Sequence, residues 1–288
     1  MKKFVFLSLL IVNSLACATL ERTFGAGETP TAIIFSTPVS LATSTPLAAT
    51  RKETSDVYCS SDVPDAVSAY NQGVTYESAG NVNAAIAAYR QAIELDPTYC
   101  DAMDNLALLL RQTDQVQEAI IWYQASIVIA PENEVSHLGL ANTYMTLEQY
   151  DNALEEYNYL LKLDVNNPEG YYGAGRVYFA EENYQEAVAQ FQKAEELYLA
   201  TGSAYLVDAQ TYSGFSYVLM QDYENGRDYL EKVYPQMQDN AYVNYYLGQC
   251  YYYGKSIYNE ALAKQYLIRA RDLGITLEPE LEKFINTP

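Results

Sequence analysis

The sequence predicts an all-α protein built from about six stacked helical hairpins. Small residues recur with spacings of 34, 34, 34, 39 and 34, at Gly73, Ala107, Ala141, Gly175, Gly214 and Gly248. A fixed period of this length indicates stacked repeat units. A column of large residues runs in phase with them, at Tyr76, Leu110, Tyr144, Tyr178, Tyr217 and Tyr251. Within a unit the apolar residues follow the helical period, as at Ala85, Ile86, Tyr89, Ala92 and Ile93.

The first 17 residues have the layout of an export signal. Lys2 and Lys3 precede an unbroken apolar run over residues 4–12, and small residues follow it. The run is too short for a bilayer, which needs about 20 residues. Residues 16–18 fit the cleavage site of a secreted protein, whereas Leu15-Ala16-Cys17 resembles the lipobox of bacterial lipoproteins, with Ser14 in place of its usual aliphatic residue. We expect residues 1–17 to be a signal peptide ending at Cys17, the site of lipidation. An uncleaved anchor is the alternative.

Residues 18–62 change in character and should form a disordered linker. They are rich in Thr and Ser, contain Pro30, Pro38 and Pro46, and have no sustained hydrophobic period. Such a segment buries too little apolar surface to offset its ordering entropy. A coil of this length reaches roughly 35–40 Å, enough to hold a domain away from a membrane. The short apolar piece at 32–35 is an alternative docking strand.

Two further columns complete each unit. One contains Ala85, Ala119, Ala153, Ala187, Gly226 and Ala261; the other contains Tyr89, Tyr123, Tyr157, Phe191 and Leu230. A breaker such as Ala79-Gly80-Asn81 separates the two apolar stripes, and Pro97 and Pro131 close the first two units. Each unit is therefore expected to be a helical hairpin in which a large side chain on one helix enters a hole left by a small residue on the other.

This pattern resembles the tetratricopeptide repeat (TPR) family. Its hallmark residues appear in the first unit as Gly73, Tyr76, Ala85, Tyr89, Ala92 and Pro97. The resemblance covers about 210 residues and implies a right-handed solenoid over residues 63–275. The last unit is also similar in part to Sel1-like repeats, because Gly254 follows Tyr251. Pro279 should open a final helix, so residues 276–288 are assigned as a capping helix and tail.

In this family the first helices of successive hairpins line a concave groove, which implies a binding face for a protein or peptide. The candidate residues on that face are Tyr70, Asn71, Asn105, Arg111, Asn142, Tyr172, Arg176, Phe179, Tyr242, Tyr245, Tyr246, Gln249, Tyr252 and Tyr253. Tyrosines suit such a face because they combine contact area with a hydroxyl group. The alternative is that several of them pack against the capping helix or a neighbouring hairpin.

Composition excludes several other functions. The formal charge is −20, from 17 basic and 37 acidic residues, so nucleic acid is not an expected partner. One histidine and four cysteines do not provide a usual zinc cluster, and no metal or cofactor is expected. His137 should be a surface or groove residue. Cys59 and Cys100 could form a disulfide outside the cytoplasm, and Cys250 should be buried and inert.

The sequence therefore predicts a non-catalytic TPR scaffold that is exported to the bacterial cell envelope, anchored by a lipid, and binds a protein or peptide. A structural or assembly component of an envelope complex is one alternative. A carbohydrate or cell-wall-binding module that uses the tyrosines is another. Neither the partner nor the oligomeric state follows from the sequence.

Overall fold

A computed structural model describes residues 59–287. The predicted signal, Cys17 and most of the predicted linker lie outside these residues. The described part contains thirteen α-helices and no β-strand. Six hairpins and one last helix are formed by α1 (Pro64–Ser78), α2 (Val82–Leu95), α3 (Cys100–Gln112), α4 (Val116–Ile129), α5 (Glu134–Thr146), α6 (Tyr150–Leu163), α7 (Pro168–Ala180), α8 (Tyr184–Thr201), α9 (Leu206–Leu219), α10 (Tyr223–Met237), α11 (Ala241–Tyr253), α12 (Glu260–Asp272) and α13 (Pro279–Ile285).

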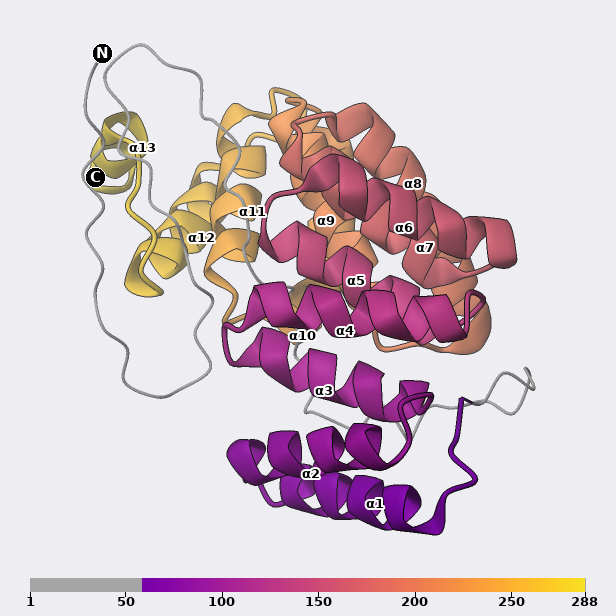
Figure 1. Ribbon diagram of the computed structural model, residues 1–288. Coiled ribbons are helices and arrows are strands. Elements are labelled where there is room, and N and C mark those ends of the chain that lie inside the picture. The colour runs from indigo at the N-terminus through magenta and orange to yellow at the C-terminus, as the bar shows by residue number, and fades with distance from the viewer. Residues whose placement is uncertain (1–58, 288) are drawn as a thin grey trace, which may run out of the picture. The chain divides into compact units, whose positions relative to one another are not determined.

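The hairpins stack in chain order, as Figure 1 shows, and every helix contacts the next one along the chain. From α3 onward, the first helix of each hairpin also contacts the first helix of the next hairpin. The second helices make no comparable contacts with one another in the described part. The first helices therefore form the inner layer of a right-handed solenoid, in agreement with the sequence prediction.

Large side chains enter holes left by glycine, both within and between hairpins. A Cβ atom added to Gly73 would lie 2.5 Å from Tyr89 Cε1, within the first hairpin. One added to Gly173 would lie 2.1 Å from Tyr157 Cε1, across the boundary between the third and fourth hairpins. Tyr89 and Tyr157 are fully buried. The contact of Gly73 with Tyr89 shows how the small-residue and large-residue columns interlock, and Gly173, two residues before Gly175 of the column, adds a contact between hairpins.

The turn inside each of the first five hairpins repeats one backbone conformation. Gly80, Asp114, Glu148, Glu182 and Gln221 all have φ between 57° and 72°. The residue after each of them donates its amide to a carbonyl near the end of the first helix, as from Asn183 N to Tyr178 O at 2.8 Å. This bond closes the helix as in a Schellman motif. Only the first of the five turns contains the glycine that the conformation favours.

In the sixth hairpin, one residue of the predicted packing columns is wrong. Ala261 is exposed, whereas Ala263 is fully buried and occupies the packing position. The connection from α11 to α12, which includes the turn at Gly254, is longer than in the other hairpins and shifts the register. After α12, Leu277, Leu281 and Ile285 are buried, so α13 caps the solenoid as predicted. Within residues 59–287 we find no helix that is both long and apolar enough to cross a membrane.

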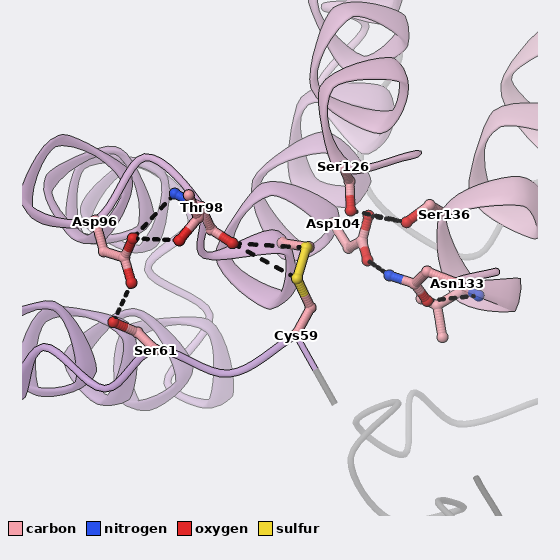
Figure 2. Close-up of a disulfide and its surroundings, with 10 residues drawn as sticks. Cys59, Ser61, Asp96, Thr98, Asp104, Ser126, Asn133 and Ser136 are labelled. Carbon is pink, nitrogen blue, oxygen red and sulfur yellow. Dashed lines mark hydrogen bonds between the residues drawn. A yellow bond between two sulfur atoms is a disulfide. The ribbon is translucent and has the colours of Figure 1, made fainter. Parts of the chain in front are cut away.

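The chain is fastened to the first two hairpins just before α1. Cys59 and Cys100, at the start of α3, form a disulfide with a Cα–Cα distance of 5.2 Å (Figure 2). Ser61 Oγ donates to Asp96 Oδ2, and the backbone amide of Thr98 donates to Asp96 Oδ1 at 3.0 Å. These bonds lower the pKa of Asp96. Cys59 and Ser61, which the sequence prediction places in the linker, thus contact the repeat domain.

Candidate partner-binding site

The inner layer of first helices, α1, α3, α5, α7, α9 and α11, presents the predicted binding residues, and we call this surface the first-helix face. At its N-terminal end the polar groups bond to one another. Asn105 Nδ2 donates to the Tyr70 hydroxyl at 3.0 Å, and the Tyr70 ring packs against Tyr89 and Tyr99. Asn71 is exposed. Tyr70 and Asn105 therefore join α1 to α3.

The centre of the first-helix face holds a cluster of Arg111, Asn142, Tyr157 and Arg176, which we call the central cluster. Tyr157 Oη donates to Asn142 Oδ1 at 2.9 Å, and Arg176 Nη1 donates to the same oxygen at 3.1 Å. Burial raises the pKa of Tyr157, and the positive charges of Arg176 and Arg111 oppose this shift. The positive charges of both guanidinium groups therefore act on one hydroxyl, although the two arginines come from α3 and α7.

The two arginines lack the ion pairs that half-buried charges usually have. Among residues 59–287, no carboxylate oxygen lies within 4.0 Å of Arg111 or Arg176. Arg111 Nε is buried and has no hydrogen-bond partner in this part of the chain. Leaving a guanidinium without an anionic partner at a partly dry site costs free energy. Within the described residues, the Tyr172 ring is an aromatic neighbour of Arg176, 5.8 Å from the guanidinium carbon, and no carboxylate neutralises either arginine within 4.0 Å.

Acidic and phenolic groups border this cluster on the side of α9. Burial raises the pKa of Asp208 to about 7; Arg176 opposes this shift and Glu169 adds to it. Tyr198 Oη donates to Glu169 Oε1 at 2.8 Å. Tyr172 is only 6% exposed, and its hydroxyl has no partner among the described residues. Acidic groups at the start of α7 (Glu169) and on α9 (Asp208) therefore act electrostatically on the same part of the face as Arg176.

Five of the predicted binding residues are buried, which corrects the expectation that they face a ligand: Tyr172, Phe179, Tyr242, Tyr245 and Tyr246. Tyr245 is 7% exposed and its hydroxyl donates to Glu278, just before α13. Tyr252 Oη donates to Glu280 Oε1 at 2.9 Å, and its ring lies 4.5 Å from that of Phe284. The alternative of packing against the capping helix therefore describes this end of the face.

The remaining candidates of the last hairpin have internal partners as well. Gln249 Nε2 donates to the Tyr245 hydroxyl at 2.8 Å. The Tyr253 ring stacks on that of Tyr223, with centroids 5.7 Å apart. Most of the tyrosines on α11 thus contact other residues of the protein. These internal contacts disfavour a carbohydrate site built on the tyrosine rings.

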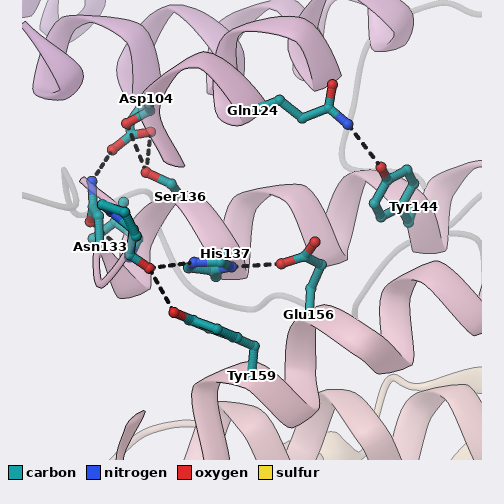
Figure 3. Close-up of polar contacts among 11 residues, drawn as sticks. Asp104, Gln124, Asn133, Ser136, His137, Tyr144, Glu156 and Tyr159 are labelled. Carbon is teal, nitrogen blue, oxygen red and sulfur yellow. Dashed lines mark hydrogen bonds and ion pairs between the residues drawn. The ribbon is translucent and has the colours of Figure 1, made fainter. Parts of the chain in front are cut away.

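A buried polar network joins the second and third hairpins, and the sequence did not reveal it. Asp104, on α3, accepts hydrogen bonds from Asn133 Nδ2 and Ser136 Oγ, both at 2.8 Å (Figures 2 and 3). Ser136 also bonds to Ser126 at 2.8 Å. Burial raises the pKa of Asp104 to about 6, although these hydrogen bonds oppose the shift. The partners come from separate helices, so no local motif marks them.

His137 belongs to the same region and corrects another prediction. It is 4% exposed, not a surface or groove residue. Its Nδ1 lies 2.6 Å from Glu156 Oε2 and its Nε2 lies 3.0 Å from the Pro131 carbonyl oxygen. Cys250 is fully buried, and burial raises the pKa of its thiol. Within residues 59–287, no group of three or more His, Cys, Asp or Glu side chains is arranged to hold a metal ion.

Comparisons with known proteins identify the repeats. A family model described as tetratricopeptide repeat matches residues 63–134 and 138–200. The structure is similar to one reported under the name "Functional Characterization of Pseudomonas Aeruginosa pilF", with a TM-score of 0.64 and 17% identity over 76% of this chain and 96% of that one. It is also similar to a tetratricopeptide repeat protein from Parabacteroides merdae ATCC 43184, with a TM-score of 0.54 and 16% identity over 77% and 97% of the two chains.

The Cut9–Hcn1 hetero-tetramer of the APC/C gives a TM-score of 0.63 and 20% identity, over 77% of this chain and 42% of that one. Identities this low establish the fold alone. The family match shows that residues 63–134 and 138–200 contain tetratricopeptide repeats, and the solved structures show that the described part has the fold of tetratricopeptide-repeat proteins. Such proteins are generally non-catalytic scaffolds with a role in protein interaction.

Proposed function

We propose that this protein is an exported scaffold that binds a carboxylate-bearing segment of a partner protein at the central cluster of the first-helix face. The observation that carries the proposal is the pair of guanidinium groups, Arg111 and Arg176, without an ion-pair partner in residues 59–287. A partner carboxylate would supply the missing charge and accept bidentate hydrogen bonds.

The overall charge restricts the kind of partner. A chain with a formal charge of −20 repels a long acidic segment, so the proposed ligand carries one or two carboxylates in an otherwise polar stretch. The acidic groups Glu169 and Asp208 border the central cluster and would repel further negative charge on that side. The proposed function therefore requires local recognition, not bulk electrostatic attraction.

An array of 12-residue peptides tests this proposal, with each glutamate-containing peptide paired with a copy that carries glutamine. We expect the wild-type protein to favour glutamate copies by about tenfold, which corresponds to about 1.4 kcal/mol. Arg176→Ala removes one guanidinium group, and Arg111→Lys keeps the positive charge but loses the planar guanidinium that binds a carboxylate with two hydrogen bonds. Both variants should therefore lose the preference for glutamate. Lys193→Ala is the matched control, since Lys193 is an exposed residue of α8 paired with Glu196.

Equal binding of glutamate and glutamine copies by the wild-type protein would refute the proposed site. It would favour the alternative of an assembly component that uses other surfaces. Circular dichroism of each variant establishes that a loss of binding does not result from unfolding.

We further propose that the chain works in the cell envelope, with Cys17 as its lipidated N-terminus. The disulfide between Cys59 and Cys100 supports a location outside the reducing cytoplasm. The signal-like layout of residues 1–17 supports export. The intact mass of the mature protein is the test: a chain that starts at Cys17 with added lipid supports anchoring, and an unmodified chain that starts further along contradicts it.

A further inference from the structure

The turn between α4 and α5 is held by the only histidine in the chain. His137 lies in the first turns of α5, and both of its ring nitrogens face acceptors from other segments. Nδ1 faces the Glu156 carboxylate on α6, and Nε2 faces the Pro131 carbonyl in the turn (Figure 3). The Tyr159 hydroxyl, also on α6, donates to the same Pro131 oxygen at 3.1 Å.

The hydrogen-bond pattern specifies the protonation state. A carbonyl oxygen only accepts, so Nε2 must carry a proton, and an ionised carboxylate only accepts, so Nδ1 must carry one too. Opposite an ionised Glu156, only the imidazolium ion satisfies both bonds. When it loses a proton to solvent, the ring retains one N–H group, and a lone pair on the other nitrogen faces an acceptor. One of the two links is then lost.

The two acidic groups near the ring, Glu156 and Asp104, favour this ion. Glu156 lies on α6, and Asp104 approaches from α3. Tyr159 stacks on the imidazole with ring centroids 4.2 Å apart. The cationic Lys162 Nζ lies 5.7 Å from the centroid of the Tyr159 ring, and its charge does not favour the imidazolium ion. Burial lowers the pKa of His137, but the hydrogen bonds to Glu156 and Pro131 and the charges of Glu156 and Asp104 together raise it above its ordinary value.

We propose that His137 is a proton-dependent latch that fixes the α4–α5 turn and the start of α5 to α6. In the protonated state it joins three segments: the turn through Pro131, α5 through its own backbone, and α6 through Glu156. In the neutral state the turn or α6 is released. The latch therefore closes in mildly acidic conditions and opens as the pH rises.

Protonation of the buried carboxyl group of Asp104 also stabilises the folded protein in acid. This group is neutral at low pH and accepts hydrogen bonds from Asn133 and Ser136, which lie just before His137. Because burial raises its pKa to about 6, its contribution to stability is also present in acid and lost as the pH rises. The two groups must be separated experimentally, and substitution of Asp104 by asparagine does so.

The latch is connected to the central cluster by short paths. Asn142 lies about one and a half turns further along α5 than His137. Tyr157, which donates to Asn142, is the residue after Glu156 on α6. Release of the α5–α6 contact at His137 would thus change the support of the central cluster. The latch itself does not depend on what that cluster binds.

Nuclear magnetic resonance provides the test, because the ring signals of a single histidine need no assignment. We expect the titration midpoint of the wild-type protein to lie above the ordinary histidine value of about 6.5. Glu156→Gln should lower the midpoint, whereas Glu155→Gln, the matched control at an exposed neighbouring position, should leave it unchanged. Asp104→Asn should lower it less than Glu156→Gln does, since Asp104 acts only through its charge.

Hydrogen exchange then distinguishes a latch from an inert buried histidine. After correction for the intrinsic rate, the amides of Ser136 and His137, which donate to the Asn133 carbonyl, should lose protection as the pH rises through the measured midpoint. This loss of protection with rising pH should persist in Asp104→Asn and be absent in Glu156→Gln. A wild-type midpoint at or below the ordinary value, equal midpoints in the Glu156 and Glu155 variants, or unchanged protection across the midpoint would each overturn the proposal.

Discussion

Removal of the Cys59–Cys100 disulfide should loosen the first hairpin more than the rest of the solenoid. The disulfide joins residues that are 41 apart in sequence, and the loop it closes contains all of α1 and α2. Closing a loop of this length reduces the entropy of the unfolded chain and so raises the free energy of unfolding. The simple polymer estimate of this stabilisation is about 4 kcal/mol, and about 2–4 kcal/mol is common in practice. The hydrogen bond from Ser61 to Asp96 crosses the same loop and should weaken with it.

The predicted effect is local, since in a solenoid each hairpin contacts only its neighbours. Hydrogen exchange of Cys59→Ser/Cys100→Ser against the wild-type protein measures it helix by helix. A loss of 2–4 kcal/mol lowers protection roughly 30- to 700-fold, and we expect this in α1 and α2 but not in α9 to α12. Cys250→Ser serves as the control for loss of a cysteine outside the disulfide. Equal protection of α1 and α2 in both proteins, or an equal loss in every hairpin, would refute the reasoning.

Three further predictions concern packing, turns and pH. Gly173→Ala should destabilise the protein by about 1–3 kcal/mol in urea unfolding, because the new Cβ would lie 2.1 Å from Tyr157 Cε1. An unfolding midpoint of this variant equal to that of the wild-type protein would contradict the prediction. Glu182→Gly should stabilise the protein by about 0.5–1 kcal/mol, because glycine adopts the left-handed conformation of this turn, with φ of 63°, without steric cost. A loss of stability would contradict this prediction. Asp104→Asn should remove about 3 kcal/mol of pH-dependent stability: the pKa rises from 3.8 to about 6, so this contribution is present in acid and lost as the pH rises through about 6. Unfolding measured at pH 4 and pH 8 in both proteins checks this, and equal pH dependence would exclude Asp104 as its source.

The fold was predictable because repetition multiplies a weak local signal. One apolar stripe such as Ala85 to Ile93 fits many helical proteins, but the recurrence of small and large residues in the same phase specifies stacked hairpins. The register failed only in the last hairpin, where the longer α11–α12 connection moved the packing position from Ala261 to Ala263. The left-handed turns at Asp114, Glu148 and Glu182 were invisible, because none of them contains glycine.

The site was harder to predict because a face of a helix does not reveal what covers it. Tyr245 and Tyr252 occupy positions that could face a ligand, and only the path of residues 277–285 decides that they contact Glu278 and Glu280 instead. Arg111 and Arg176 were selected for being polar residues on first helices. Their lack of ion-pair partners depends on the surroundings of both side chains, which a one-dimensional pattern does not contain. His137 was misplaced for the same reason, since its partners lie in a turn and on another helix.

The most direct test of the central claim is affinity capture of the native partner from the organism's own membrane fraction with three baits. These are the wild-type protein, Arg111→Ala/Arg176→Ala, and Lys193→Ala, each shown to be folded. The account predicts that a partner cross-linked through the first-helix face is recovered with the wild-type protein and the Lys193 variant and lost with the double variant. Recovery of the same partner in equal yield with all three baits would contradict it.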